Sequence, residues 1–218
     1  MVKRMKFVVC SLLVASAGCF DIGEGKGSLK GSLFIRECTT TADIGSFATP
    51  ALYDMKPTFF VADPIDDFPK TMPMNKLGIR VQPTGNRFEE ADALYVNVAS
   101  VRDIALVLGQ AITVGPATNI RAALDMNATC PDRAVQAELD GTINFTAFGG
   151  AESGLTPGYD FRVAFGDRLT ASFVFDVIDR RVTTLGDTGD LNDTPSVAGH
   201  LEGTFDFVVR QGRSAQVL

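Results

Sequence analysis

Alternation of apolar and polar residues with a period of two dominates most of this chain. The longest examples are Leu29–Ile35, Ile120–Cys130, Leu169–Val177 and Leu201–Phe207. Successive side chains of a strand point to opposite faces, so alternation places one set in a core and the other in water. Turn-forming residues separate most of these segments. The pattern predicts a mostly β protein, an antiparallel β-sandwich or barrel-like domain.

Shorter apolar segments predict further strands, with a hairpin before the strand that starts at Leu169. These segments are Pro57–Ala62, Leu77–Gln82, Ala93–Ala99, Ala111–Val114 and Tyr159–Phe165. Gly166-Asp167 separates the last of them from the Leu169 strand, and a two-residue link with glycine suits the turns that match strand twist. We therefore expect Tyr159–Phe165 to pair with the Leu169 strand.

One short helix is predicted over residues 101–108. Ser100 is suited to cap its start, Asp103 follows three residues later, and Gly109 is suited to end it. The domain is therefore expected to contain at most this one short helix.

In three predicted strand segments a glycine stands two residues after a leucine: Leu29-x-Gly31, Leu139-x-Gly141 and Leu201-x-Gly203. A glycine on the inward face leaves room for a large neighbouring side chain or for a closer sheet. We interpret the similarity as a shared packing constraint rather than as a duplicated module.

The N-terminus has the form of a secretory signal peptide. Lys3, Arg4 and Lys6 precede an apolar run of 11 residues, 7–17, and small residues then lead to Cys19. Because a helix needs roughly 20 apolar residues to cross a bilayer, this run is too short for a permanent membrane span.

The segment Ser16-Ala17-Gly18-Cys19 resembles the lipobox of bacterial lipoproteins. The resemblance implies cleavage before Cys19 and acylation of that residue, which would hold the protein on a membrane through its acyl chains. Phe20, rather than an aspartate, follows the cysteine, and the resemblance then favours the outer membrane over the inner one. The alternative is cleavage after Ala15-Ser16-Ala17, which would release a soluble secreted protein.

This interpretation divides the chain into three parts. Residues 1–18 are the signal peptide, residues 19–28 are the lipidated cysteine with a flexible tether, and residues 29–218 form a single β domain. Loss of residues 1–18 would change the formal net charge from −6 to −9. A chain this acidic is a poor partner for nucleic acid, and no particular protein or glycan partner is indicated.

The cysteine count predicts one disulfide. Of the four cysteines, Cys10 leaves with the signal peptide and Cys19 is assigned to lipid. Cys38 and Cys130 remain as a pair in an oxidising compartment. Two buried free thiols are the alternative, because cysteine also packs well as a small apolar residue.

No catalytic motif points to an enzyme, and no catalytic residues are assigned. His200 is the sole histidine, and because it directly precedes the apolar Leu201 it is expected to point to solvent. The leading hypothesis is a cell-envelope lipoprotein with a non-catalytic structural or binding role. The alternative is a small envelope hydrolase that acts on carbohydrate through carboxylates, although no pair among 26 acidic residues stands out.

No cofactor is expected, apart from one weak indication of calcium. Asp187, Asp190, Asn192 and Asp193 place four oxygen-bearing side chains within seven residues. Oxygen ligands from a flexible loop suit calcium, which would make the chain a calcium-dependent adhesion module. The same residues are also common in ordinary turns.

Overall fold

The computed structural model describes eight segments of the chain. They are residues 25–33, 51–65, 75–85, 90–130, 135–179, 184–185, 191–192 and 196–209. These segments contain one helix, α1 (Val101–Leu106), and twelve strands. The strands are β1 (Gly25–Leu33), β2 (Ala51–Met55), β3 (Phe59–Pro64), β4 (Leu77–Gln82), β5 (Ala93–Val98), β6 (Ala111–Val114), β7 (Ile120–Asp125), β8 (Gln136–Phe148), β9 (Arg168–Asp179), β10 (Thr184–Leu185), β11 (Leu191–Asn192) and β12 (Ser196–Val208).

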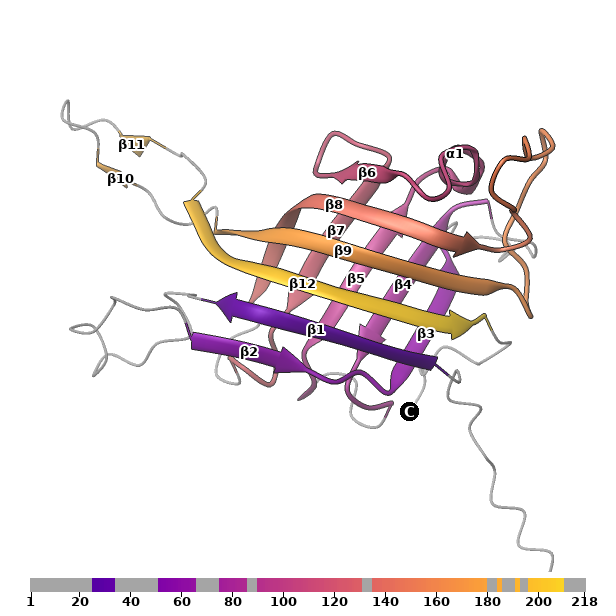
Figure 1. Cartoon of the computed structure of the whole chain (residues 1–218). Helices are drawn as coiled ribbons and strands as arrows, with labels where there is room; N and C mark the ends of the chain where they lie inside the picture. The colour runs from indigo at the N-terminus through magenta and orange to yellow at the C-terminus, as the bar shows by residue number, and fades with distance from the viewer. Residues whose placement is uncertain are drawn as a thin grey trace, which may run out of the picture.

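Ten of the strands form one sheet, in the order β2-β1-β12-β9-β8-β6-β7-β5-β4-β3. All described pairs are antiparallel except the short contact between β6 and β7. In Figure 1, β1, β12, β9 and β8 form a front layer, and β7, β5 and β4 pass behind it. The sheet is thus curled into a half-barrel, which confirms a mostly β, sandwich-like or barrel-like domain.

The long strand β8 is where the sheet bends. One edge of β8 pairs with β9 along most of its length. Its other edge pairs with β7 near its start and with β6 farther along. A single strand therefore belongs to both layers, and the two layers enclose one core.

A short connection brings the two ends of the sheet together. β2 and β3 lie at opposite edges, yet only residues 56–58 separate them in the chain. Four residue steps span at most about 14 Å, so Met55 and Phe59 must lie close to each other. Phe60 of β3 also stacks on Phe207 of β12 across the interior, with ring centroids 5.5 Å apart.

Phenylalanines fill the centre of the half-barrel. Phe145, Phe173, Phe205 and Phe207 all point inward and are 4% exposed or less. The ring centroid of Phe205 lies 6.1 Å from that of Phe145, 6.2 Å from that of Phe173 and 5.8 Å from that of Phe207. Aromatic contacts of this kind stabilise a core beyond the area that they bury.

Inward-facing glycines make room for these rings. A Cβ atom at Gly203 would lie 2.6 Å from the ring of Phe173, and one at Gly25 would lie 2.8 Å from the ring of Phe60. The predicted packing role of the repeated glycine is confirmed at Gly203, where a Cβ atom would also collide with the backbone oxygen of Ser28 in β1, so both the ring and the neighbouring strand need the space.

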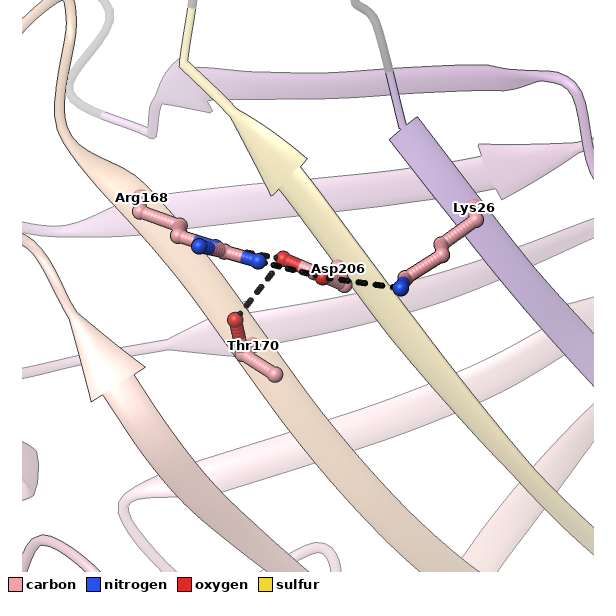
Figure 2. A network of polar contacts seen from close by, with 4 residues as sticks. All are labelled: Lys26, Arg168, Thr170 and Asp206. Atoms are coloured by element: carbon pink, nitrogen blue, oxygen red, sulfur yellow. Dashed lines mark hydrogen bonds and ion pairs between the residues drawn. The ribbon is translucent and has the colours of Figure 1, made fainter.

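The outer face of β1, β12 and β9 carries a polar network centred on Asp206 (Figure 2). The carboxylate accepts 2.7 Å hydrogen bonds from Nε and Nη2 of Arg168 and a 2.9 Å bond from Oγ1 of Thr170. Nζ of Lys26 lies 3.9 Å away. The hydrogen bonds from Arg168 lower the pKa of Asp206.

The helix forms where it was expected, although it ends earlier, at Leu106. Oγ of Ser100 accepts a 3.4 Å hydrogen bond from the backbone N–H of Asp103, as a capping residue does. Gly109 adopts a φ of 81°, a conformation that favours glycine after a helix. No helix among the described residues is long and apolar enough to cross a membrane.

The predicted hairpin before β9 is wrong. Residues 159–165 form a turn and a loop with one isolated bridge residue, Val163, rather than a strand. Both edges of β9 are already occupied, one by β8 and the other by β12, so no edge is left for a further partner. Gly166 instead donates a 2.6 Å hydrogen bond to the carbonyl oxygen of Val209, which follows β12.

Two predicted boundaries also differ. β1 begins at Gly25, so residues 25–28, which were expected in the flexible tether, pair with β12. β7 ends at Asp125, although alternation continues to Cys130. Asp92 accepts hydrogen bonds from the backbone N–H groups of Ala128 and Thr129. Those groups are held in a turn instead of a strand ladder.

Candidate functional site

Most of the residues predicted for lipid and calcium lie outside the described residues. This applies to Cys19 and to Asp187, Asp190 and Asp193. Asn192 belongs to the two-residue strand β11. The lipidation and calcium assignments therefore stay predictions. Among the described residues, no group of three or more His, Cys, Asp or Glu side chains is placed to hold a metal ion.

Cys130 lies in the core, at the end of the turn that follows β7. Its side chain is 3% exposed, and it is disulfide-bonded. Cys38 lies outside the described residues, so the pairing of Cys38 with Cys130 stays a prediction.

His200 points to solvent from β12, as predicted, while Leu201 is buried. The structure adds a partner that sequence reasoning missed. Nδ1 of His200 lies 2.5 Å from Oδ1 of Asp176, which is directly opposite in β9. The two side chains are 72% and 45% exposed. Water therefore screens the pair, and it lies on the open outer face of the sheet.

A second polar cluster surrounds Asp92, which is buried just before β5. Besides the two turn amides, its carboxylate accepts a 3.0 Å hydrogen bond from the hydroxyl of Tyr53 and a 2.5 Å bond from Oγ1 of Thr129. Burial, followed by the charge of Asp92, raises the pKa of Tyr53 well above its usual range. Tyr53 thus stays a hydrogen-bond donor. This cluster joins β2, β5 and the turn, which is a structural role.

The described surface is hollowed at the end of the sheet that carries α1. A groove of about 340 Å³ lies between three segments, residues 75–76, 99–103 and 159–162. In Figure 1, α1 and the loop after β8 lie at this same end of the sheet. The volume is at the lower end of the range for small-molecule sites, about 300–1,000 Å³.

Backbone and side-chain hydrogen bonds fix the walls of the groove. The N–H of Val101 donates a 3.1 Å bond to the carbonyl oxygen of Asn75. Nδ2 of Asn119 donates a 3.1 Å bond to the carbonyl oxygen of Ser100. The third wall is anchored by Phe161, which packs against the core. The groove is therefore formed by segments that are tied to the body of the domain.

Arg102 and Tyr159 carry the most distinctive contact in the groove. The guanidinium carbon of Arg102 lies 5.3 Å from the centre of the Tyr159 ring, within the range of a cation–π interaction. Nε of Arg102 is buried and has no hydrogen-bond partner in the part of the chain that the structure describes. Tyr159 itself is 89% exposed. The groove is thus lined by a guanidinium and by an aromatic ring that is open to a ligand.

The charges that line the groove are mixed. Lys76, Arg102 and Arg162 are cationic, and Asp103 and Asp160 are anionic. The lining is thus slightly positive, although the whole chain carries a net charge of −6. The sequence does not indicate this site, because its three segments are far apart in the chain and contain no motif. An aromatic residue in the loop sequence Pro157-Gly158-Tyr159 is the one signal that points toward it.

No protein-family model, no curated protein and no solved structure matches this chain. Its function must therefore be inferred from its own residues and their arrangement.

Proposed function

We propose that this protein is a cell-envelope lipoprotein with a non-catalytic binding role, and that it binds its ligand in the groove beside α1. The observation that carries the binding role is the contact between Arg102 and Tyr159. Arg102 and Tyr159 both line the groove, and the Tyr159 ring is 89% exposed, so a cation and an open aromatic ring meet at one place on the described surface.

The arrangement of Arg102 also favours binding energetically. The Tyr159 ring restrains the guanidinium before any ligand arrives. A restrained side chain loses less conformational freedom on binding than a mobile one, so more of the interaction energy appears as affinity.

We further propose that acyl chains on Cys19 hold the domain at a membrane, with the outer membrane as the favoured destination. The basic start, the short apolar run and the small residues before Cys19 support this assignment. Because β1 begins at Gly25, the six residue steps from Cys19 span at most about 20 Å. The domain would therefore lie close to the membrane surface.

An exported protein also accounts for a disulfide, and we propose Cys38 as the partner of Cys130. The other two cysteines, Cys10 and Cys19, are assigned to the signal peptide and to lipid. The buried, disulfide-bonded state of Cys130 is consistent with an oxidising compartment.

Lipidation is tested by labelling cells that express the full chain with radioactive palmitate. We expect label on the wild-type protein and on the Cys10→Ser control, and none on Cys19→Ser, which should leave the membrane fraction. Mass spectrometry of the mature protein should find an acylated Cys19 at its N-terminus. An unmodified N-terminus at Gly18 would show free secretion instead.

The binding role is tested by co-sedimentation of residues 19–218 carrying Cys19→Ser, which lack the acyl chains, with isolated cell-envelope material. We expect Tyr159→Ala to reduce the bound fraction. Leu155→Ala is the matched control, because Leu155 is 64% exposed in the same loop and does not line the groove. Equal sedimentation of the wild type and both variants would count against a binding role for the groove.

A further inference from the structure

We infer that the loop after β8, residues 149–167, contacts the lipid surface when the protein is anchored there. Leu155 and Phe165 would be the side chains that enter the boundary between headgroups and acyl chains. This inference rests on the proposed acylation of Cys19, and it adds which face of the domain meets the membrane.

Strand register places this loop at the end of the domain nearest the anchor. Four residues lie opposite one another in a row across β8, β9, β12 and β1, namely Phe148, Leu169, Phe207 and Gly25. In Figure 1 the loop extends from the right-hand end of the front layer, where β1 also begins. Neighbouring strands lie about 4.8 Å apart, so the ends of β8 and β1 are about 15 Å apart. An anchor at Cys19 therefore holds the whole row near the lipid.

The loop exposes apolar side chains although it is tied to the core. Leu155 is 64% exposed and Phe165 is 39% exposed. Between them in the chain, Val163 is buried and Phe161 packs against the core. Exposed apolar side chains that gather on one part of a surface mark contacts with proteins or membranes. Because the loop is held by the core, the two exposed side chains are presented without a large loss of conformational freedom.

The charges of the loop favour an apolar contact over an electrostatic one. Its single cation is Arg162, and its carboxylates are Glu152, Asp160 and Asp167. Such a segment has no attraction for anionic headgroups, so the surface that suits it is one of zwitterionic phospholipid. Lipid is favoured over a protein partner because the anchor itself keeps lipid within reach of the loop.

Anchoring decides whether the contact forms. Two partly exposed apolar side chains alone would bind a bilayer only in about the millimolar range or more weakly. A short tether supplies an effective concentration of about the same size. The contact should therefore form in the anchored protein and be absent from the unacylated Cys19→Ser protein, in which Leu155→Ala is a neutral change.

Tryptophan fluorescence tests the inference, because the chain contains no tryptophan of its own. Leu155→Trp and Phe165→Trp each place one fluorophore in the loop. Leu52→Trp is the matched control, because Leu52 is 94% exposed on β2 and pairs with Ser32, at the far end of β1 from Gly25. The acylated mature variants are reconstituted into phosphatidylcholine vesicles with brominated acyl chains, which quench nearby tryptophan. We expect quenching and a shift to shorter wavelength for both loop variants and neither change for Leu52→Trp.

A second set of samples separates the contact from the acylation. The three variants are also made as residues 19–218 with Cys19→Ser, and without an anchor they should not be quenched. An N-terminal histidine tag then holds them on brominated vesicles that contain a nickel-chelating lipid, and quenching of the two loop variants should appear. This arm gives a result even if Cys19 carries no acyl chain, so failure of the lipidation proposal is distinguishable from failure of the inference.

Three outcomes would overturn the inference. The first is quenching of the anchored loop variants no stronger than that of Leu52→Trp. The second is equal quenching with and without the anchor, and the third is quenching that appears only when phosphatidylglycerol is added to the vesicles. The co-sedimentation of the unanchored protein through Tyr159 is independent of all three, so the binding role would still stand.

Discussion

At the scale of single residues, Asp92 shows how one buried carboxylate can organise its surroundings. It is 6% exposed and accepts hydrogen bonds from Tyr53, from the amides of Ala128 and Thr129, and from the Thr129 hydroxyl. These donors come from β2 and from the turn that leads to Cys130. Several segments that are distant in sequence therefore depend on one side chain.

We expect Asp92→Ala to destabilise the fold by about 3 kcal/mol, because several buried donors lose their acceptor at once. Tyr53→Phe removes only one of the donors to Asp92 and should cost about 1 kcal/mol. Urea unfolding followed by circular dichroism measures both changes. Equal losses for the two variants would contradict a central role for Asp92.

Asp206 predicts a dependence of stability on pH. The hydrogen bonds from Arg168 lower its pKa in the folded state, whereas the unfolded value is about 3.9. The stabilisation is therefore complete above about pH 4 and is lost as the pH falls through the lower, folded value. Urea midpoints of Asp206→Asn measured from pH 7 to pH 2 should show a smaller loss on acidification than those of the wild type.

Glu202→Gln is the control for this measurement, because Glu202 is an exposed carboxylate on the same strand. It should follow the wild-type profile more closely than Asp206→Asn does. If Asp206→Asn kept the full wild-type loss of stability in acid, the network in Figure 2 would not be the cause.

At the scale of secondary-structure elements, β12 is central to the fold although it lies near the end of the chain. It pairs with β1 on one edge and with β9 on the other. Its inward residues Leu201, Phe205 and Phe207 are 2% exposed or less. Loss of packing on this strand would therefore affect the front layer of the sheet and the core at once.

Phe205→Ala should destabilise the protein by about 3–5 kcal/mol, because it leaves a cavity among packed rings. Phe165→Ala is a matched control that removes the same atoms from a residue that is 39% exposed, and it should cost much less. The difference between the two unfolding free energies is the quantity to measure. A loss below 1 kcal/mol for Phe205→Ala would show that β12 is peripheral.

At the scale of the whole molecule, the proposed disulfide would restrain a large part of the chain. Cys38 and Cys130 lie 92 positions apart. In the chain-entropy description, a bridge over such a loop stabilises the fold by about 4–5 kcal/mol. We expect reduction to lower the unfolding midpoint of the mature protein accordingly.

Alkylation of the denatured, unreduced protein provides the direct check on the bridge. Neither Cys38 nor Cys130 should be labelled before reduction, and both should be labelled after it. Labelling of Cys38 without reduction would rule out the pairing.

The sequence by itself determined the features that depend on near neighbours in the chain. Alternation identified the inward residues of β9 and β12, because side chains two apart share a face whatever the strands pair with. Ser100 marked the start of α1, because capping joins groups within three or four residues, whereas the helix ends at Leu106, before Gly109. Alternation also predicted the outward position of His200, because His200 directly precedes the inward-facing Leu201.

Tertiary structure decided everything that depends on which strands become neighbours. The hairpin before β9 fails because β8 and β12, which are joined to β9 by longer connections, occupy both edges of β9. Strand register places His200 opposite Asp176, and the fold brings Arg102 and Tyr159 together across 57 positions. No local pattern in the sequence indicates either contact. The strand order and register that form are those that minimise the free energy of the whole sheet, not of any one segment.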